Sequence, residues 1–196
     1  HLSEFPEALR ITTVFFKRTQ VIDCVLNLRA RTRITLWTLI VGAVMPKKTD
    51  AALASELQRK GHLAFNWDDL DKIELPSGIV TSMYRVGDST DAASPTVFKV
   101  FYPPNCYTEA HTHACDYTEI ILEGTQKVGA TWHVAGDIRI GLANRGYGPL
   151  VAGPEGATVL FMFKDGQWPA ITLGNNDGST LGSEVISEHL AHRNPP

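Results

Sequence analysis

Cysteine is scarce in this sequence: there are only three, Cys24, Cys106 and Cys115, in 196 residues. A small and odd number of cysteines excludes the disulfide framework of a small secreted domain, and the lack of C-x-x-C spacing excludes a zinc knuckle. We therefore expect reduced thiols and a cytoplasmic protein.

A basic stripe and a long apolar run are lacking as well. Residues 45–196 carry twelve Lys and Arg against eighteen Asp and Glu, so no basic surface is expected to attract nucleic acid. The apolar stretch 34–44 spans eleven residues, whereas crossing a bilayer takes about 20 residues. We expect neither nucleic acid nor a membrane among the partners.

Residues 1–44 differ from the rest of the chain. They carry six Lys and Arg against three Asp and Glu and keep neither a helical period nor a strand alternation, whereas Met45 opens a segment typical of a protein's beginning. We interpret residues 1–44 as an upstream leader outside the native protein. The alternative is a signal peptide, whose basic region would be formed by Arg29, Arg31 and Arg33.

The remaining chain begins with one helix and continues with short strand patterns separated by turn residues. Residues 50–60 are predicted to form the helix, with Thr49 or Asp50 as its cap and Gly61 at its end. From residue 79 onward, apolar segments are separated by Pro-Pro, Glu-Gly, Ala-Gly-Asp, Asn-Arg-Gly and Gly-Pro-Glu-Gly, which is typical of a β-sandwich or small barrel. The expected divisions are a leader (1–44), a helix and lead-in (45–78), a β-domain (79–168) and an extension (169–196) with a helix over 183–192.

The stretch HTHACDYTEIILEG, residues 111–124, carries the candidate chemistry. Residues i and i+2 of a β-strand point to the same face, so His111 and His113 can aim both imidazoles at one point. That arrangement provides half of a metal site. The alternative interpretation is a vestigial histidine pair that no longer binds a metal.

This stretch resembles the first motif of the cupin superfamily, G(X)5HXH(X)3,4E(X)6G. Residues 135–163, AGDIRIGLANRGYGPLVAGPEGATVLFMF, resemble the second, G(X)5PXG(X)2H(X)3N. The resemblance implies an all-β fold, a cupin jelly-roll β-barrel with a short N-terminal helix, in a small single-domain metal-binding protein. It also implies one divalent metal ion, a small-molecule substrate and a homodimer formed through edge strands.

Two positions depart from the cupin pattern. The glutamate expected after the histidine pair is Tyr117, and the histidine expected in the second motif is Tyr147. Glu119 lies two residues beyond Tyr117 on the same strand face and could replace the missing ligand. Either tyrosine could line the pocket, ligate the metal as a phenolate, bind substrate through its hydroxyl, or act as a general acid or base.

We predict that His111, His113 and Glu119 hold the metal. Two histidines and one carboxylate with open positions suit Fe(II), with Zn, Mn or Ni as alternatives. Tyr117 and Tyr147 are the predicted catalytic residues. Two residues are predicted to bind substrate. Trp132 is expected to form part of the pocket wall, and Arg139 is expected to pair with a carboxylate group of the substrate.

The predicted function is metal-dependent chemistry on a small organic molecule, with an Fe(II) dioxygenase as the first hypothesis. The second is a metal-dependent lyase or isomerase in which a tyrosine acts as the base. The third, from a different class, is a non-enzymatic cupin that binds a small molecule or a metal ion.

Overall fold

A computed structural model describes residues 47–174 and 181–193 of the chain. These described residues all belong to one compact unit. The interpretation of residues 1–44 as a leader lies outside the described residues and stays a prediction. Within the described residues, neither helix is long and apolar enough to cross a membrane.

The expected N-terminal helix is confirmed as α2, Asp50–Lys60. The Thr49 hydroxyl accepts a hydrogen bond from the backbone N–H of Ala52 at 3.2 Å, and Gly61 ends the helix with a left-handed φ of 72°. A second helix, α3, covers Leu181–Arg193 in the C-terminal extension, where the sequence predicts one.

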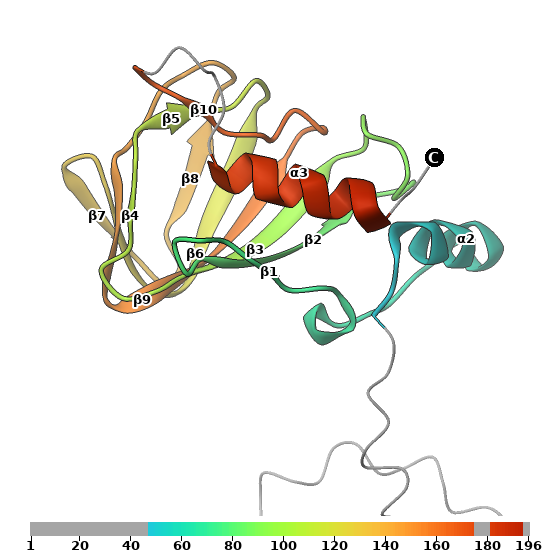
Figure 1. Ribbon diagram of the computed structural model, residues 1–196. Coiled ribbons are helices and arrows are strands. Elements are labelled where there is room, and N and C mark those ends of the chain that lie inside the picture. Colours follow the sequence, from blue (N-terminus) through green and yellow to red (C-terminus); the bar gives the residue numbers. More distant parts are fainter. Residues whose placement is uncertain (1–46, 175–180, 194–196) are drawn as a thin grey trace, which may run out of the picture. The chain divides into compact units, whose positions relative to one another are not determined.

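The main sheet has eight antiparallel strands, and its long strands lie side by side in Figure 1. The strand order is β1-β2-β3-β9-β6-β7, with β4 paired to β9 and β8 paired to β6. A separate two-stranded sheet joins β5 and β10. The all-β cupin jelly-roll predicted from the sequence is thus confirmed as a fold class. The strands are β1 (Ile73–Glu74), β2 (Val80–Arg85), β3 (Thr96–Tyr102), β4 (Tyr107–Thr108), β5 (His111–Thr112), β6 (Tyr117–Val128), β7 (Thr131–Val134), β8 (Ile138–Gly141), β9 (Leu150–Phe163) and β10 (Ile171–Thr172).

Two of the expected turns were wrong, because β6 and β9 each continue through their glycines. β6 passes Gly124 with register shifts on either side of it, and β9 continues through Gly153 and Gly156, where its pairing with β6 skips from Ala152 to Ala157. Gly124 adopts a φ of 72°, and a Cβ at that position would overlap the carbonyl oxygen of Gly156. These glycines allow two long paired strands to bend together, which a turn prediction from composition does not distinguish.

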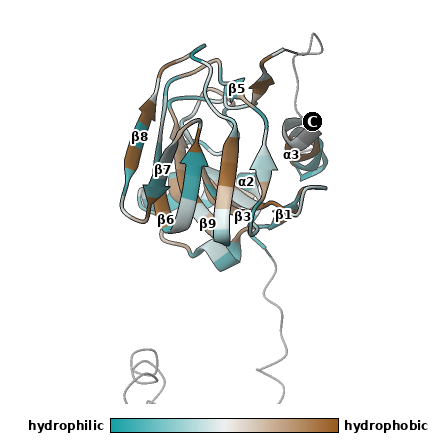
Figure 2. Ribbon diagram, turned by 90° about the vertical axis from the view of Figure 1, so that its left-hand side faces the viewer, coloured by the Kyte–Doolittle hydropathy of each residue, from teal (hydrophilic) through white to brown (hydrophobic). Residues whose placement is uncertain are grey.

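Side chains alternate between the two faces of each strand, so some are buried in the core and others, on β8, are apolar but exposed. Phe98 and Tyr102 on β3 and Phe161 on β9 face the interior and belong to the buried core. On β8, which pairs only with β6 among the described strands, the outward side chains of Ile138 and Ile140 are 64% and 78% exposed. Figure 2 shows β8 at the left edge, with brown hydrophobic stretches separated by a teal hydrophilic one.

Candidate functional site

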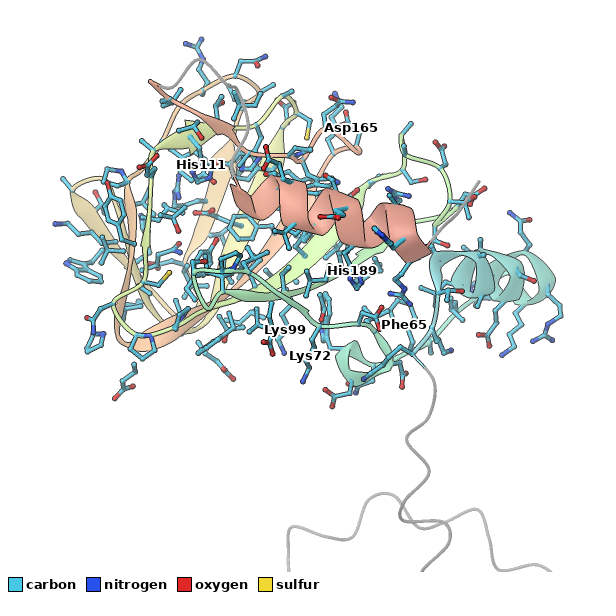
Figure 3. The ribbon with its side chains drawn as sticks, viewed as in Figure 1. Phe65, Lys72, Lys99, His111, Asp165 and His189 are labelled. Carbon is cyan, nitrogen blue, oxygen red and sulfur yellow. The ribbon has the colours of Figure 1, made fainter. Side chains whose placement is uncertain are left out.

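His111 and Tyr147 are held together by the backbone. The N–H of His111 donates to the Tyr147 carbonyl at 3.0 Å, and the N–H of Tyr147 donates back at 2.9 Å. Such an antiparallel bridge places the two side chains next to each other on one face. His113 follows two residues later, and its side chain is buried beside that of His111. Figure 3 shows His111 near the beginning of α3.

The orientation of both imidazole rings is set by backbone carbonyl groups. Nδ1 of His111 lies 2.8 Å from the carbonyl oxygen of Glu109, and Nδ1 of His113 lies 2.6 Å from that of Trp168. A carbonyl oxygen can only accept, so both Nδ1 atoms carry the proton and both Nε2 atoms keep a free lone pair. This is the orientation that metal-ligating histidines take.

Both Nε2 atoms face the hydroxyl of Tyr147. Its oxygen lies 2.8 Å from Nε2 of His111 and 3.1 Å from Nε2 of His113. A hydroxyl has one proton, so it can satisfy only one of these two lone pairs. The second Nε2 is left as an acceptor facing an oxygen, and a bound cation would remove that conflict.

Two of the donor spacings are ordinary hydrogen-bond lengths that are also compatible with one divalent ion. Metal–ligand bonds of about 2.1 Å at right angles place neighbouring donor atoms about 3.0 Å apart, close to both distances between Nε2 and the Tyr147 oxygen. The fit uses two imidazole nitrogens and one phenol oxygen. In the part of the chain that the structure describes, no group of three His, Cys, Asp or Glu side chains is placed to hold a metal.

Burial governs the charge of these groups in the free protein. Burial, with a smaller contribution from neighbouring His111, lowers the pKa of His113 to about 4, and burial also lowers the pKa of His111. Burial raises the pKa of Tyr147 well above its usual value. At neutral pH, the histidines are therefore neutral and Tyr147 keeps its proton.

Tyr117 extends the polar group beyond Tyr147. The rings of the two tyrosines lie against each other, with centroids 5.7 Å apart. Burial raises the pKa of Tyr117 to about 12. The structure thus brings together four of the predicted site residues: His111, His113, Tyr117 and Tyr147.

Glu119 does not join the histidines but pairs with Arg139. The guanidinium Nη1 of Arg139 donates to Oε1 of Glu119, and these two residues are cross-strand partners on β8 and β6. Only 1% of Glu119 is exposed, and its Oε2 atom has no hydrogen-bond partner among the described residues. Burial raises the pKa of the Glu119 carboxyl, although Arg139 opposes this shift. The third donor beside the histidines is the Tyr147 hydroxyl, not the carboxylate expected from the sequence.

A cavity of about 390 Å³ opens in front of the histidine pair. His111, His113 and Tyr147 form its polar end, and side chains of β2, β3, β9 and α3 form its walls. Sequence reasoning missed most of these walls. Alternation in β3 and β9 could have identified Phe98, Phe161 and Phe163, whereas nothing in the sequence indicated Trp168 or Ile186.

The two predicted substrate-binding residues do not line this cavity. Trp132 lies on β7 opposite Lys127 of β6, and its side chain is 51% exposed. Arg139 points toward Glu119, and its guanidinium lies 5.0 Å from the centroid of the Tyr147 ring. Arg139 therefore contacts the Tyr147 ring from outside the lining of the cavity.

Tyr117 is positioned by a glycine, which gives a first testable expectation. Gly141 is its cross-strand partner on β8, and a Cβ at Gly141 would overlap the Tyr117 ring. We expect Gly141→Ala to displace the ring and lower the free energy of unfolding by about 1–3 kcal/mol, measured by urea denaturation. Combining it with Tyr117→Ala should remove the conflict. Simple addition of the two single effects would contradict this explanation.

The antiparallel jelly-roll, with His111 on β5 and His113 directly after that strand, is a cupin fold, as the motif at residues 111–124 predicts. No protein-family model matches the sequence, and no curated protein sequence matches it. Comparison with solved structures finds an RmlC-like cupin from Shewanella frigidimarina, with 15% identity, a TM-score of 0.43, and coverage of 52% of this chain and 88% of that one.

A second similar structure is a variant of oxalate decarboxylase from Bacillus subtilis, with 19% identity and a TM-score of 0.48. The match covers 63% of this chain but only 38% of the decarboxylase. A structure concerned with the Mn(II) centres of that decarboxylase matches to the same extent. These similarities concern the course of the chain and carry nothing about its chemistry.

Proposed function

We propose that the protein is a metal-dependent enzyme that acts on a small organic molecule bound in the cavity. The observation that supports this proposal is the convergence of two histidine Nε2 atoms on the Tyr147 oxygen. His111, His113 and Tyr147 would hold the ion. When bound, a divalent metal polarises a substrate carbonyl and makes the adjacent C–H bond more acidic.

The donor set favours proton transfer, and hence a lyase or isomerase. Glu119 is engaged by Arg139, so the two-histidine, one-carboxylate set typical of Fe(II) oxygenases is incomplete. The rings of Tyr147 and Tyr117 instead lie against each other beside the histidines. In this proposal, Tyr147 would lose its proton on ligating the ion, and its oxygen would take the proton of the adjacent substrate C–H bond, while Tyr117 orients that oxygen. The apolar walls keep water away from the reacting atoms.

An Fe(II) dioxygenase is the second candidate. Three protein donors leave three positions of an octahedral ion open, and an oxygenase needs such positions for substrate and O₂.

An oxygen electrode and NMR-detected deuterium exchange distinguish the two reactions. The probe is 4-phenylbutan-2-one, and the added ion is Fe(II), Mn(II) or Zn(II). O₂ uptake would favour the dioxygenase, and exchange without O₂ the lyase or isomerase. Metal binding with neither activity would favour a non-enzymatic binding protein.

Tyr147→Phe tests the role of the hydroxyl. We expect this variant to exchange the probe's C–H protons about 100-fold more slowly than the wild type, because it loses the oxygen that takes the proton but keeps the ring. Tyr107→Phe is the matched control, since Tyr107 also lines the cavity but is exposed. An undiminished rate in Tyr147→Phe would remove Tyr147 from the mechanism.

We also propose the cytoplasmic location and the homodimer expected from the sequence. The exposed isoleucines of β8 support the homodimer, because an apolar edge strand is a surface at which a second copy can pair.

A further inference from the structure

A series of aromatic side chains in mutual contact lines the cavity beside the histidines. Phe163 packs against the His113 ring, with centroids 4.8 Å apart, and against Phe98 at 5.8 Å. Phe98 in turn contacts Trp168 at 4.9 Å. All of these side chains line the cavity. A molecule that reaches the histidines therefore lies along a continuous aromatic surface.

The lining carries no positive charge away from the histidines. None of the described residues that line the cavity is Lys or Arg, and the one acidic residue among them, Glu109, is exposed. Arg139 lies outside the lining and is paired with Glu119. The remaining polar groups are neutral hydroxyls, those of Ser77, Thr81, Tyr102, Tyr107, Thr108, Thr172 and Ser183.

An anionic group in the body of the cavity would therefore be desolvated without a partner. Burying a charge without compensation is strongly unfavourable, whereas aromatic and alkyl groups gain from leaving water. A metal ion at the histidines could compensate the negative charge of one oxygen atom at that end of the cavity. It could not balance a carboxylate or phosphate located among the phenyl rings.

Helix α3 closes the other side of the cavity with small and apolar groups. Ile186 is buried and lines the cavity together with Gly182. A Cβ at Gly182 would lie 3.1 Å from Cδ1 of Leu75, so the glycine lets the helix approach closely. This wall of the cavity is thus also suited to an uncharged group.

We infer that the substrate is an uncharged aryl-alkyl ketone or alcohol, with its oxygen toward Tyr147 and its ring among Phe98, Phe163 and Trp168. This assignment rests on the proposed function for the position of the oxygen. It excludes dicarboxylates and phosphorylated compounds as substrates.

The test compares two ligands of nearly the same shape by isothermal titration calorimetry. The probes are 4-phenylbutan-2-one and 3-phenylpropanoate, which differ by a methyl group in place of a charged oxygen. We expect the full chain, freed of metal with EDTA, to bind the ketone at least tenfold more tightly. Butan-2-one, which lacks the ring, should bind at least tenfold more weakly than the phenyl ketone. The inference is overturned if the carboxylate binds as tightly as the phenyl ketone, if butan-2-one does so, or if the phenyl ketone gives no binding heat at millimolar concentration.

A gain-of-function variant strengthens the test. Thr172 lines the cavity and is the cross-strand partner of His111. Thr172→Lys should raise the affinity for 3-phenylpropanoate about tenfold, whereas the neutral control Thr172→Gln should not. An unchanged carboxylate affinity in a folded Thr172→Lys variant counts against the inference.

Metal content, measured separately, distinguishes the two proposals. Ketone preference in a protein that binds no metal would refute the proposed function and leave the substrate class standing. Metal binding without ketone preference would refute the substrate class alone.

Discussion

The double variant His111→Ala/His113→Ala should retain less than a tenth of the divalent metal that the wild type binds. Two of the three donors at the site are the Nε2 atoms of these residues, and a single phenol oxygen does not hold an ion in competition with water. Metal analysis of protein purified without a histidine tag measures the effect. Exchange or turnover, where the wild type shows it, should fall at least 100-fold.

Thermal unfolding provides an independent measure of the same loss. A ligand that binds only the folded state at about 100 times its Kd stabilises that state by about 2.7 kcal/mol. Added Mn(II) or Fe(II) should therefore raise the Tm of the wild type but not that of the double variant.

His133→Ala is the matched control for this experiment. His133 lies on β7 near Asp137 and takes no part in the cavity. It should keep the wild-type metal content and the wild-type response to added metal. Equal metal content in wild type and double variant would end the metal hypothesis, even if activity were lost.

The second large effect is expected from Arg139→Met. Removing the guanidinium leaves the carboxylate of Glu119, which is 1% exposed, without its partner. Breaking a buried ion pair in this way costs about 3–5 kcal/mol of folding free energy. Urea denaturation at pH 7 measures the loss. The variant should also disturb Tyr147, whose ring lies against the same guanidinium.

The pH dependence of this variant has a definite sign. Burial already raises the pKa of Glu119, and loss of Arg139 removes the group that opposes the shift. An acid whose pKa is raised in the folded state contributes stability below its unfolded pKa and loses that contribution as pH rises through the folded pKa. The deficit of Arg139→Met should therefore be small near pH 4 and grow toward pH 7.

Two controls isolate the buried pair. Adding Glu119→Leu to Arg139→Met should recover much of the stability, because no unpaired charge remains. Lys72→Met breaks the exposed Lys72–Asp68 pair and should have no measurable effect. If Arg139→Met is as stable as the wild type at pH 7, then pairing with Arg139 does not compensate the burial of the Glu119 carboxylate, and the prediction is wrong.

The sequence predicted those parts of the fold that depend on local pattern. Helix α2 begins after Thr49 and ends before Gly61, as the sequence predicts, because capping involves only nearby residues. Tyr147 was identified by its distance along the second motif. Its contact with both histidines could not be predicted, because it depends on the backbone bridge to His111 and on the ring orientations.

The partner of Glu119 could not be predicted from the sequence. Counting along β6 correctly put its side chain on the face of Tyr117, yet the register between β6 and β8 decides that Arg139 meets it. Trp168 is a similar case, because it reaches His113 from a loop 55 residues further along the chain. Such long-range pairings leave no periodic signal in the sequence.

The carbonyl groups that orient the histidines make the site robust to mutation. The acceptors for the two Nδ1–H groups belong to the backbone at Glu109 and Trp168. Any substitution at these positions keeps a carbonyl group, so side-chain variation there preserves both acceptors as long as the loop holds its course. Side-chain substitutions at these two positions can therefore change the shape of the cavity without altering the orientation of the imidazole rings.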